Sequence, residues 1–150
     1  MNLERANYTT YLINDLYYIS IPKDWIFIED DRFRAESKNG NTLLTVSNYQ
    51  YENIDRNKKA HTFLEELMLP MFEIFETEDG YIPLDIFENK ADYMLKSYKV
   101  DDETQYILAT ARFFYNSLIV TTLQVHDIEE YNIELKNLLK TIFQSIQYVS

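Results

Sequence analysis

The sequence predicts an α+β fold in which a mostly antiparallel β-sheet packs with two main helices. Three observations predict this class: β-prone segments with short turns come first, one amphipathic helical segment follows, and four more strands precede a second helix. The length of 150 residues suits one domain with its own core. No repeat, low-complexity tract or linker divides the chain, so we expect a single domain over residues 1–150.

The first third of the chain contains β-prone runs separated by turn residues. Strands are expected over residues 8–13, 16–21, 25–28, 33–36 and 42–51. Asn14-Asp15 predicts a hairpin, and Asn39-Gly40 is the strongest hairpin signal because both residues tolerate the positive φ of a type I′ turn. Pro22 ends the first ladder because it has no backbone donor. Residues 52–60 are polar and basic, which indicates a loop.

An amphipathic helix is expected after this loop. Thr62 followed by Glu65 fits a capping box, in which each side chain bonds the exposed amide of the other residue. Apolar side chains recur at three- and four-residue spacing and mark one buried stripe: Phe63, Leu64, Leu67, Met68, Met71, Phe72 and Phe75. Pro70 lies inside this pattern, and we expect it to kink the helix or split it in two. Gly80 is placed to end the helix in a left-handed conformation.

Four further strands and a second helix are expected in the C-terminal half. The strands are expected over residues 81–88, 92–100, 104–115 and 117–126. Turns at Asp101-Asp102-Glu103 and Asn116-Ser117 join the last three as a meander. Asp127 is expected to cap the second helix, with Glu130 three residues on. The apolar stripe of that helix contains Ile128, Tyr131, Leu135, Leu138, Leu139, Ile142 and Ile146.

The last predicted hairpin indicates how the layers pack. A two-residue turn at Asn116-Ser117 would pair Phe113 with Val120 on one face, and Phe114 with Ile119 on the other. Both faces then carry large apolar groups. In a sheet with one solvent-exposed face, apolar and polar residues would instead alternate along each strand. Either helices cover both faces, or one face is left partly open for a partner.

Composition and charge exclude several function classes. The chain has 14 basic and 25 acidic residues, a net charge of −11, so its surface would repel a nucleic-acid backbone. Two glycines and no cysteine exclude glycine-rich phosphate cradles, disulfides and thiol chemistry. The longest apolar stretches fall far short of the roughly 20 residues that a membrane helix needs, so we expect no membrane insertion. Residues 1–7 lack the pattern of a secretory signal, and we expect a cytoplasmic location.

Catalytic and metal-binding patterns are not apparent. His61 and His126 form no helical His-x-x-x-His pair, and we expect both to be structural or solvated. The acidic clusters fall at predicted turns and helix ends, and none matches the alternating oxygen ligands of a calcium loop. No serine lies in the Gly-x-Ser-x-Gly pattern. We therefore expect no metal, no cofactor and no enzymatic activity.

Tyrosine is the unusual component of this sequence. Thirteen tyrosines are more than a core of this size demands, and many alternate along predicted strands. Interfaces use tyrosine for its large contact area and polar tip, but strand propensity for aromatics also explains much of the enrichment. Arg112 is a cation within an apolar strand, so it should snorkel, pair with an acid or face a partner. The candidate partner-binding residues are Tyr49, Tyr51, Tyr98, Tyr106 and Arg112.

Two segments have a recognisable pattern. Residues 18–25 form a strand that ends in Pro22-Lys23-Asp24-Trp25, and residues 104–126 form a long hairpin that leads into a helix closing on Phe143-Gln144-Ser145-Ile146. With this order of elements, the chain resembles PsbP-like domains, a group that includes Mog-type Ran-binding factors and bacterial DcrB-like proteins. The resemblance implies an α/β/α sandwich, generally without an enzyme active site. The group includes photosystem accessory proteins, nuclear transport factors and bacterial chaperones for toxic effectors, and the N-terminus fits the last branch best.

Two functions remain open from the sequence. The first is a non-enzymatic cytoplasmic module that binds another protein, most concretely as a bacterial toxin accessory, either effector chaperone or immunity protein; a homodimer is the other assembly left open. An acidic protein suits a basic toxin through electrostatic steering. The second is a small-molecule carrier or an enzyme, with a pocket between the sheet and the Pro70-kinked helix. Such a pocket would be lined by Met68, Met71, Phe72 and Phe75, whose helical spacing core packing also explains.

Overall fold

A computed structural model describes residues 7–29, 32–38, 40–50, 58–78, 80–114, 117–126 and 133–149 of the chain. The predicted α+β class is confirmed, because these residues form two helices and a mostly antiparallel arrangement of strands. The first six strands of the chain are β1 (Tyr8–Ile13), β2 (Tyr17–Pro22), β3 (Ile26–Glu29), β4 (Phe33–Glu36), β5 (Thr42–Gln50) and β6 (Ile82–Lys90). The remaining strands are β7 (Tyr93–Val100), β8 (Glu103–Phe114), β9 (Ser117–His126) and β10 (Gln147–Tyr148). The helices are α1 (Ala60–Glu78), between β5 and β6, and α2 (Ile133–Gln144), between β9 and β10.

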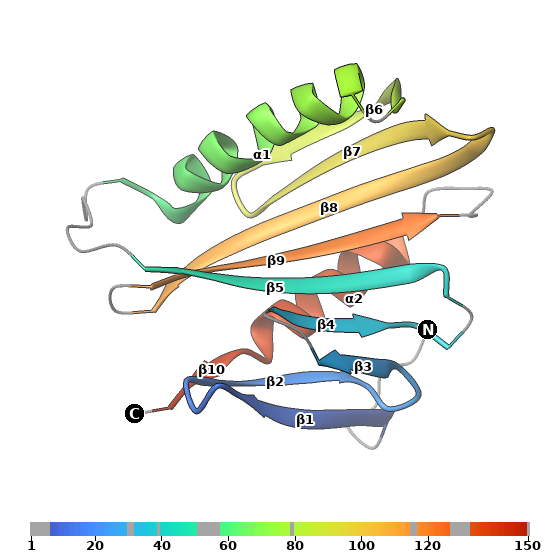
Figure 1. Ribbon diagram of the computed structural model, residues 1–150. Helices are drawn as coiled ribbons and strands as arrows, with labels where there is room; N and C mark the ends of the chain where they lie inside the picture. The colour runs from blue at the N-terminus through green and yellow to red at the C-terminus, as the bar shows by residue number, and fades with distance from the viewer. Residues whose placement is uncertain are drawn as a thin grey trace.

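The strands form a large sheet and a small one. The large sheet has seven strands in the order β3-β4-β5-β9-β8-β7-β6, and the small sheet has three in the order β1-β2-β10. Every pair of neighbours in both sheets is antiparallel. The meander from β6 to β9 therefore places β6 at one edge of the large sheet, and β3 is the opposite edge (Figure 1).

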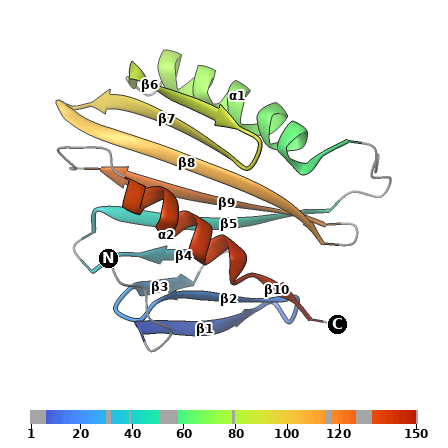
Figure 2. The same ribbon diagram turned by 180° about the vertical axis from the view of Figure 1, so that it is seen from behind.

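One helix packs on each face of the large sheet, which gives three layers. We call the face under α1 the front face and the face under α2 the back face (Figures 1 and 2). Leu64, Met68 and Phe72 of α1 are buried in one apolar cluster with front-face residues of β7, β8 and β9. Leu138, Leu139 and Ile142 of α2 belong to a second cluster, which also contains Ile19 and Ile21 of the small sheet. Truncating any of these side chains to alanine should cost about 2–5 kcal/mol.

Two hairpin turns have the backbone conformation that their residues predict. Asn14 and Asp15 have φ angles of 52° and 57°, and Asp101 and Asp102 have φ angles of 49° and 66°. Positive φ at both central residues is the type I′ conformation, whose twist matches that of the strands it joins. Asparagine and aspartate tolerate this conformation better than other non-glycine residues. Gly40 also has a positive φ of 77°, while its predicted turn partner at position 39 lies outside the described residues.

Helix α1 differs from the prediction at its start and at Pro70. It begins at Ala60, and the Thr62 amide donates to the Lys59 carbonyl at 3.0 Å, so the predicted capping box at Thr62 is wrong. The helix also continues past Pro70 instead of splitting. Pro70 is exposed, so water can bond the Glu66 carbonyl that the missing proline amide leaves free. Gly80 follows the helix with a φ of 73°, as predicted.

The last hairpin has a different register from the predicted one. Phe113 pairs with Leu118 instead of Val120, because the two residues between β8 and β9 are 115 and 116. The shift is two residues, and a shift of two keeps every side chain on its predicted face. The expected cap at Asp127 lies outside the described residues. In the described part of the predicted apolar stripe, Leu138, Leu139, Ile142 and Ile146 are all buried, as expected.

Candidate functional site

The described residues among the predicted partner-binding set do not form a single site. Tyr98 is fully buried on the front face, where its ring lies 6.0 Å from that of Phe72 and 5.3 Å from that of Tyr81. Tyr106 is 4% exposed and belongs to the cluster on the opposite face. The prediction that these two residues contact a partner is therefore wrong, because long-range packing has taken both into the core. Strand propensity explains both positions.

The other predicted residues lie in different places. Tyr49 is half-buried against the front-face cluster, and Tyr51 lies outside the described residues. Arg112 is exposed on the back face near the end of β8. Its guanidinium carbon lies 4.6 Å from the ring centre of Phe114 and 6.0 Å from that of Phe143 in α2. Arg112 therefore keeps its charge at the surface while its guanidinium packs beside two aromatic rings.

The pocket expected between α1 and the sheet does not have the predicted lining. Met68 and Phe72 are 2% and 1% exposed and pack in the core. Phe75 packs against Tyr81 with 4.9 Å between ring centres, and Met71 is exposed. The helical spacing of these residues therefore reflects core packing, which was the alternative explanation.

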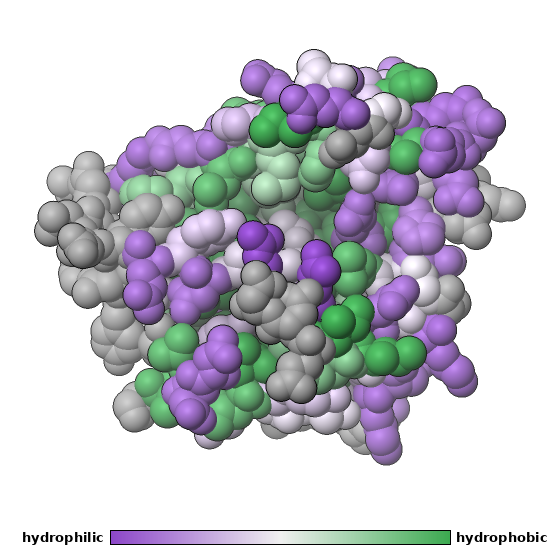
Figure 3. Space-filling view, in the orientation of Figure 1, coloured by the Kyte–Doolittle hydropathy of each residue, from purple (hydrophilic) through white to green (hydrophobic). Residues whose placement is uncertain are grey.

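Exposed apolar side chains concentrate on α1 and β6, which are consecutive in the chain and adjacent in space. Of the eleven large apolar side chains exposed in the described part of the chain, six lie on these two elements: Leu69, Met71, Ile74, Ile82, Leu84 and Phe87. Figure 3 shows apolar and polar side chains interleaved over α1. Leu69 lies three residues before Phe72 and seven before Glu76, so it shares the side of the helix that faces β6 and β7. We define the β6 surface as Leu69, Ile82, Leu84 and Phe87. This surface wraps around the edge of the sheet, because Phe87 pairs with Lys96 on the front face, whereas Ile82 pairs with Lys99 and therefore lies on the back face.

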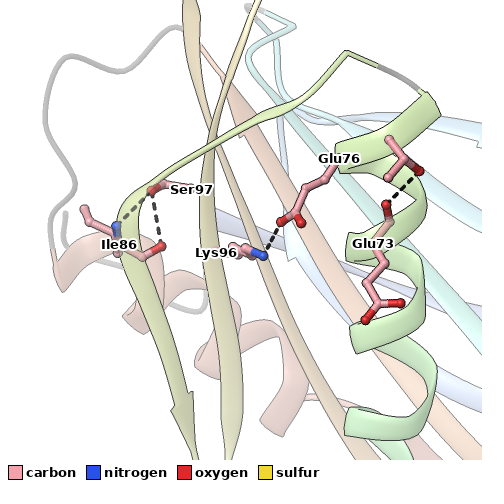
Figure 4. Close-up of polar contacts among 6 residues, drawn as sticks. Glu73, Glu76, Ile86, Lys96 and Ser97 are labelled. Carbon is pink, nitrogen blue, oxygen red and sulfur yellow. Dashed lines mark hydrogen bonds and ion pairs between the residues drawn. The ribbon is translucent and has the colours of Figure 1, made fainter.

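Strand β6 carries this surface at the edge of the large sheet. Among the described strands it pairs only with β7, and the pairing shifts between Pro83 and Phe87. Inside this bulge, the Ile86 amide donates to the Ser97 hydroxyl, which in turn donates to the Ile86 carbonyl, both at 3.2 Å (Figure 4). A proline and a bulge protect an edge strand against indiscriminate pairing. Residues 87–90, in contrast, pair regularly with β7. On the other side of these residues, no described strand pairs with the backbone.

Polar contacts fix β6 and β7 against α1. The Lys96 ammonium on β7 donates to the Glu76 carboxylate on α1 (Figure 4). The same ammonium lies 5.4 Å from the ring centre of Phe72 and 5.7 Å from that of Phe87. The Asn89 amide on β6 donates to the Glu65 carboxylate of α1 at 3.1 Å. These contacts hold the exposed Phe87 beside the helix in the free protein, so binding would require little reordering.

Acidic groups border the β6 surface. Glu73 and Asp85 are exposed on α1 and β6, and the exposed Glu66 is paired with Lys58. Two cations lie close by: Lys96 is paired with Glu76, and Lys99 lies 3.6 Å from Asp102. The surface therefore combines apolar contact area with a negative border, within a chain whose net charge is −11.

Within the described ranges, no group of three or more histidine, cysteine, aspartate or glutamate side chains could hold a metal ion. Neither of the two described helices is long and apolar enough to cross a membrane.

The fold defines an α+β protein with one helix on each face of an antiparallel sheet, and solved structures share it. No protein-family model matches the sequence, and no curated protein matches it. A structure from Bacteroides thetaiotaomicron VPI-5482 is similar over 96% of this chain, with a TM-score of 0.63 and 9% identity; the chain spans only 49% of that structure. LpqN, which is involved in cell envelope biogenesis of Mycobacterium tuberculosis, is similar over 95% of this chain and 91% of its own, with a TM-score of 0.50 and 8% identity. At these identities the similarity concerns the fold alone.

Proposed function

We propose that this chain is a non-enzymatic protein-binding module and that the β6 surface receives the partner. One observation carries the proposal: Leu69, Ile82, Leu84 and Phe87 are 40%, 59%, 37% and 49% exposed on a helix and an edge strand that lie side by side. Single exposed apolar residues are ordinary, whereas a group of them on adjacent elements is typical of an interaction site.

The partner that fits best is another protein with an apolar segment flanked by lysine or arginine. The apolar part would cover the β6 surface, and the basic flanks would meet Glu73 and Asp85. A second copy of this chain fits less well, because two molecules with a net charge of −11 repel each other. The bulge in β6 limits strand addition to about residues 87–90, so side-chain contacts would supply most of the affinity.

The finer form of the proposal is a cytoplasmic accessory protein of a bacterial toxin, either a chaperone or an immunity protein. Two arguments support it. The element order resembles the PsbP-like group, which includes chaperones for toxic effectors. The strong negative charge also complements a basic toxin and would accelerate its association.

Site-specific photo-crosslinking tests the proposal in the organism that makes the protein. A photoreactive phenylalanine analogue replaces Phe87 in one variant and Phe27 in the matched control. Phe27 is also an exposed phenylalanine, at 38%, but it lies on β3 at the opposite edge of the sheet. We expect a crosslink to one dominant protein from position 87 and not from position 27.

The purified partner then gives the affinity test. Ile82→Ser should weaken binding at least tenfold, or about 1.4 kcal/mol, and Ile26→Ser on β3 should leave it unchanged. Both isoleucines are 59% exposed, so the two variants remove equal apolar exposure. Equal effects of the two variants, or a crosslink from position 87 only to another copy of this chain, would contradict the proposal.

A further inference from the structure

A second site lies on the back face, away from the β6 surface. Helix α2 and strands β7 and β8 border a cavity of about 390 Å³ that is open to solvent on one side. Its lining includes Tyr93, Leu108 and Thr110 from the sheet and Asn137, Leu139 and Phe143 from α2. This volume lies within the roughly 300–1,000 Å³ of cavities that bind small molecules. Apolar and aromatic side chains come from both walls of the cavity, and polar groups lie among them.

Hydrogen bonds and an ion pair hold the polar part of this cavity. The Thr110 hydroxyl donates to the Asp92 carbonyl at 2.8 Å and so ties the β6–β7 turn to β8. The Asp92 carboxylate lies 3.6 Å from the Lys140 ammonium on α2. The Tyr93 hydroxyl donates to the Glu88 carboxylate at 2.5 Å. The acid nearest the cavity therefore has a cation beside it, which reduces its repulsion of an anionic ligand.

Arg112 adds a positive charge at the rim. It lies two residues beyond Thr110 on the same face of β8, and its guanidinium carbon is 6.0 Å from the ring centre of Phe143, which lines the cavity. Arg112 forms no ion pair with any residue that the structure describes. Acids outnumber bases by 25 to 14 in this chain, so an arginine that has no acidic partner among the described residues stands out beside a cavity.

We propose that this cavity binds a small amphipathic carboxylate, with its apolar body between Leu139 and Phe143 and its carboxylate on the Arg112 guanidinium. A guanidinium binds a carboxylate through two parallel hydrogen bonds, which gives both affinity and orientation. The aromatic ring of Phe143 lies beside both parts of the proposed site. This site is independent of the β6 surface and does not need a protein partner.

Calorimetric titration of the purified chain tests the proposal with two carboxylates, octanoate and 1-naphthoate, and with their neutral amides. We expect at least one carboxylate to bind one per chain and its amide to bind at least tenfold more weakly. Arg112→Gln should weaken binding of that carboxylate at least tenfold. Lys99→Gln is the matched control, because it removes the same charge from an exposed residue six positions along β7 from Tyr93, roughly 20 Å away.

A second variant tests the cavity itself. Asn137 is exposed on α2 and lines the cavity, so Asn137→Trp should fill it and abolish binding while the circular dichroism spectrum stays unchanged. Equal binding of carboxylate and amide would overturn the role of Arg112. An equal loss in Lys99→Gln would show general charge attraction instead of a site. No binding of either carboxylate to the wild-type chain would overturn the whole proposal.

Discussion

The ion pair between Lys96 and Glu76 should contribute more to stability than an ordinary surface pair. It joins β7 to α1, and its side chains are only 19% and 24% exposed. The Lys96 ammonium also lies 5.4 Å from the ring centres of both Phe72 and Tyr98. Replacing Glu76 by glutamine keeps the shape of the side chain but leaves this half-buried ammonium without its carboxylate. Only weaker contacts with the rings and with water would remain.

The expected magnitude follows from the burial of the pair. Exposed pairs contribute about 0–1 kcal/mol, while breaking a fully buried pair costs about 3–5 kcal/mol. The Lys96–Glu76 pair lies between these limits, so Glu76→Gln should lower the free energy of unfolding by about 2 kcal/mol. Lys58 and Glu66 form the matched pair, because their side chains are 31% and 55% exposed. Glu66→Gln should therefore cost less than about 1 kcal/mol.

Urea denaturation of the wild type and both variants measures the difference. The midpoint should fall for Glu76→Gln with an unchanged slope, which indicates a loss of stability in the same folded state. Adding Lys96→Met to Glu76→Gln should recover part of the loss, because an apolar side chain needs no counter-charge. Equal losses for Glu76→Gln and Glu66→Gln, or no recovery in the double variant, would refute this reasoning.

Three further predictions concern backbone conformation and one buried tyrosine. Burial, and then the negative charge of Glu76, raise the pKa of Tyr98, so the folded state holds this proton more tightly than the unfolded state. The wild type should therefore lose stability above the ordinary tyrosine pKa of about 10, and Tyr98→Phe should remove about 1.4 kcal/mol of that loss in total between melts at pH 9 and pH 11. Gly80→Ala should cost about 1 kcal/mol in thermal unfolding, because Gly80 has a φ of 73° although no atom within 4 Å would meet the added Cβ. Replacing Asp101-Asp102 by Asn-Gly should stabilise the protein by about 1 kcal/mol in the same assay, because both positions have positive φ.

Local signals in the sequence predict most of the elements. The turns at Asn14-Asp15 and Asp101-Asp102 depend on residues that tolerate positive φ, and such preferences act within a few positions. The sequence does not reveal the start of α1, because Ala60 and His61 carry no capping signal, whereas Thr62 and Glu65 fit one by chance. The polar pair Asn116-Ser117 suggests a register for the last hairpin that differs by two residues from the observed pairing of Phe113 with Leu118.

The candidate site was harder to predict because burial depends on contacts between distant segments. Tyr98 and Phe87 are both aromatic residues on neighbouring strands, yet Tyr98 lies under α1 while Phe87 lies at the edge of the sheet and is 49% exposed. One signal could have located the β6 surface. Strand β6 follows a helix and is the first strand of a meander, so no preceding strand pairs with it. Its apolar residues are therefore candidates for exposure. Arg112 was found by its type alone, since a cation in an apolar strand demands an explanation.

Hydrogen–deuterium exchange tests the role of the β6 surface most directly. Exchange is measured for the chain alone and with the purified partner crosslinked from position 87. We predict slower exchange in residues 87–90 and around Leu69 when the partner is bound, with no change in β3. Slower exchange in β3 or in α2, with β6 unaffected, would contradict the account.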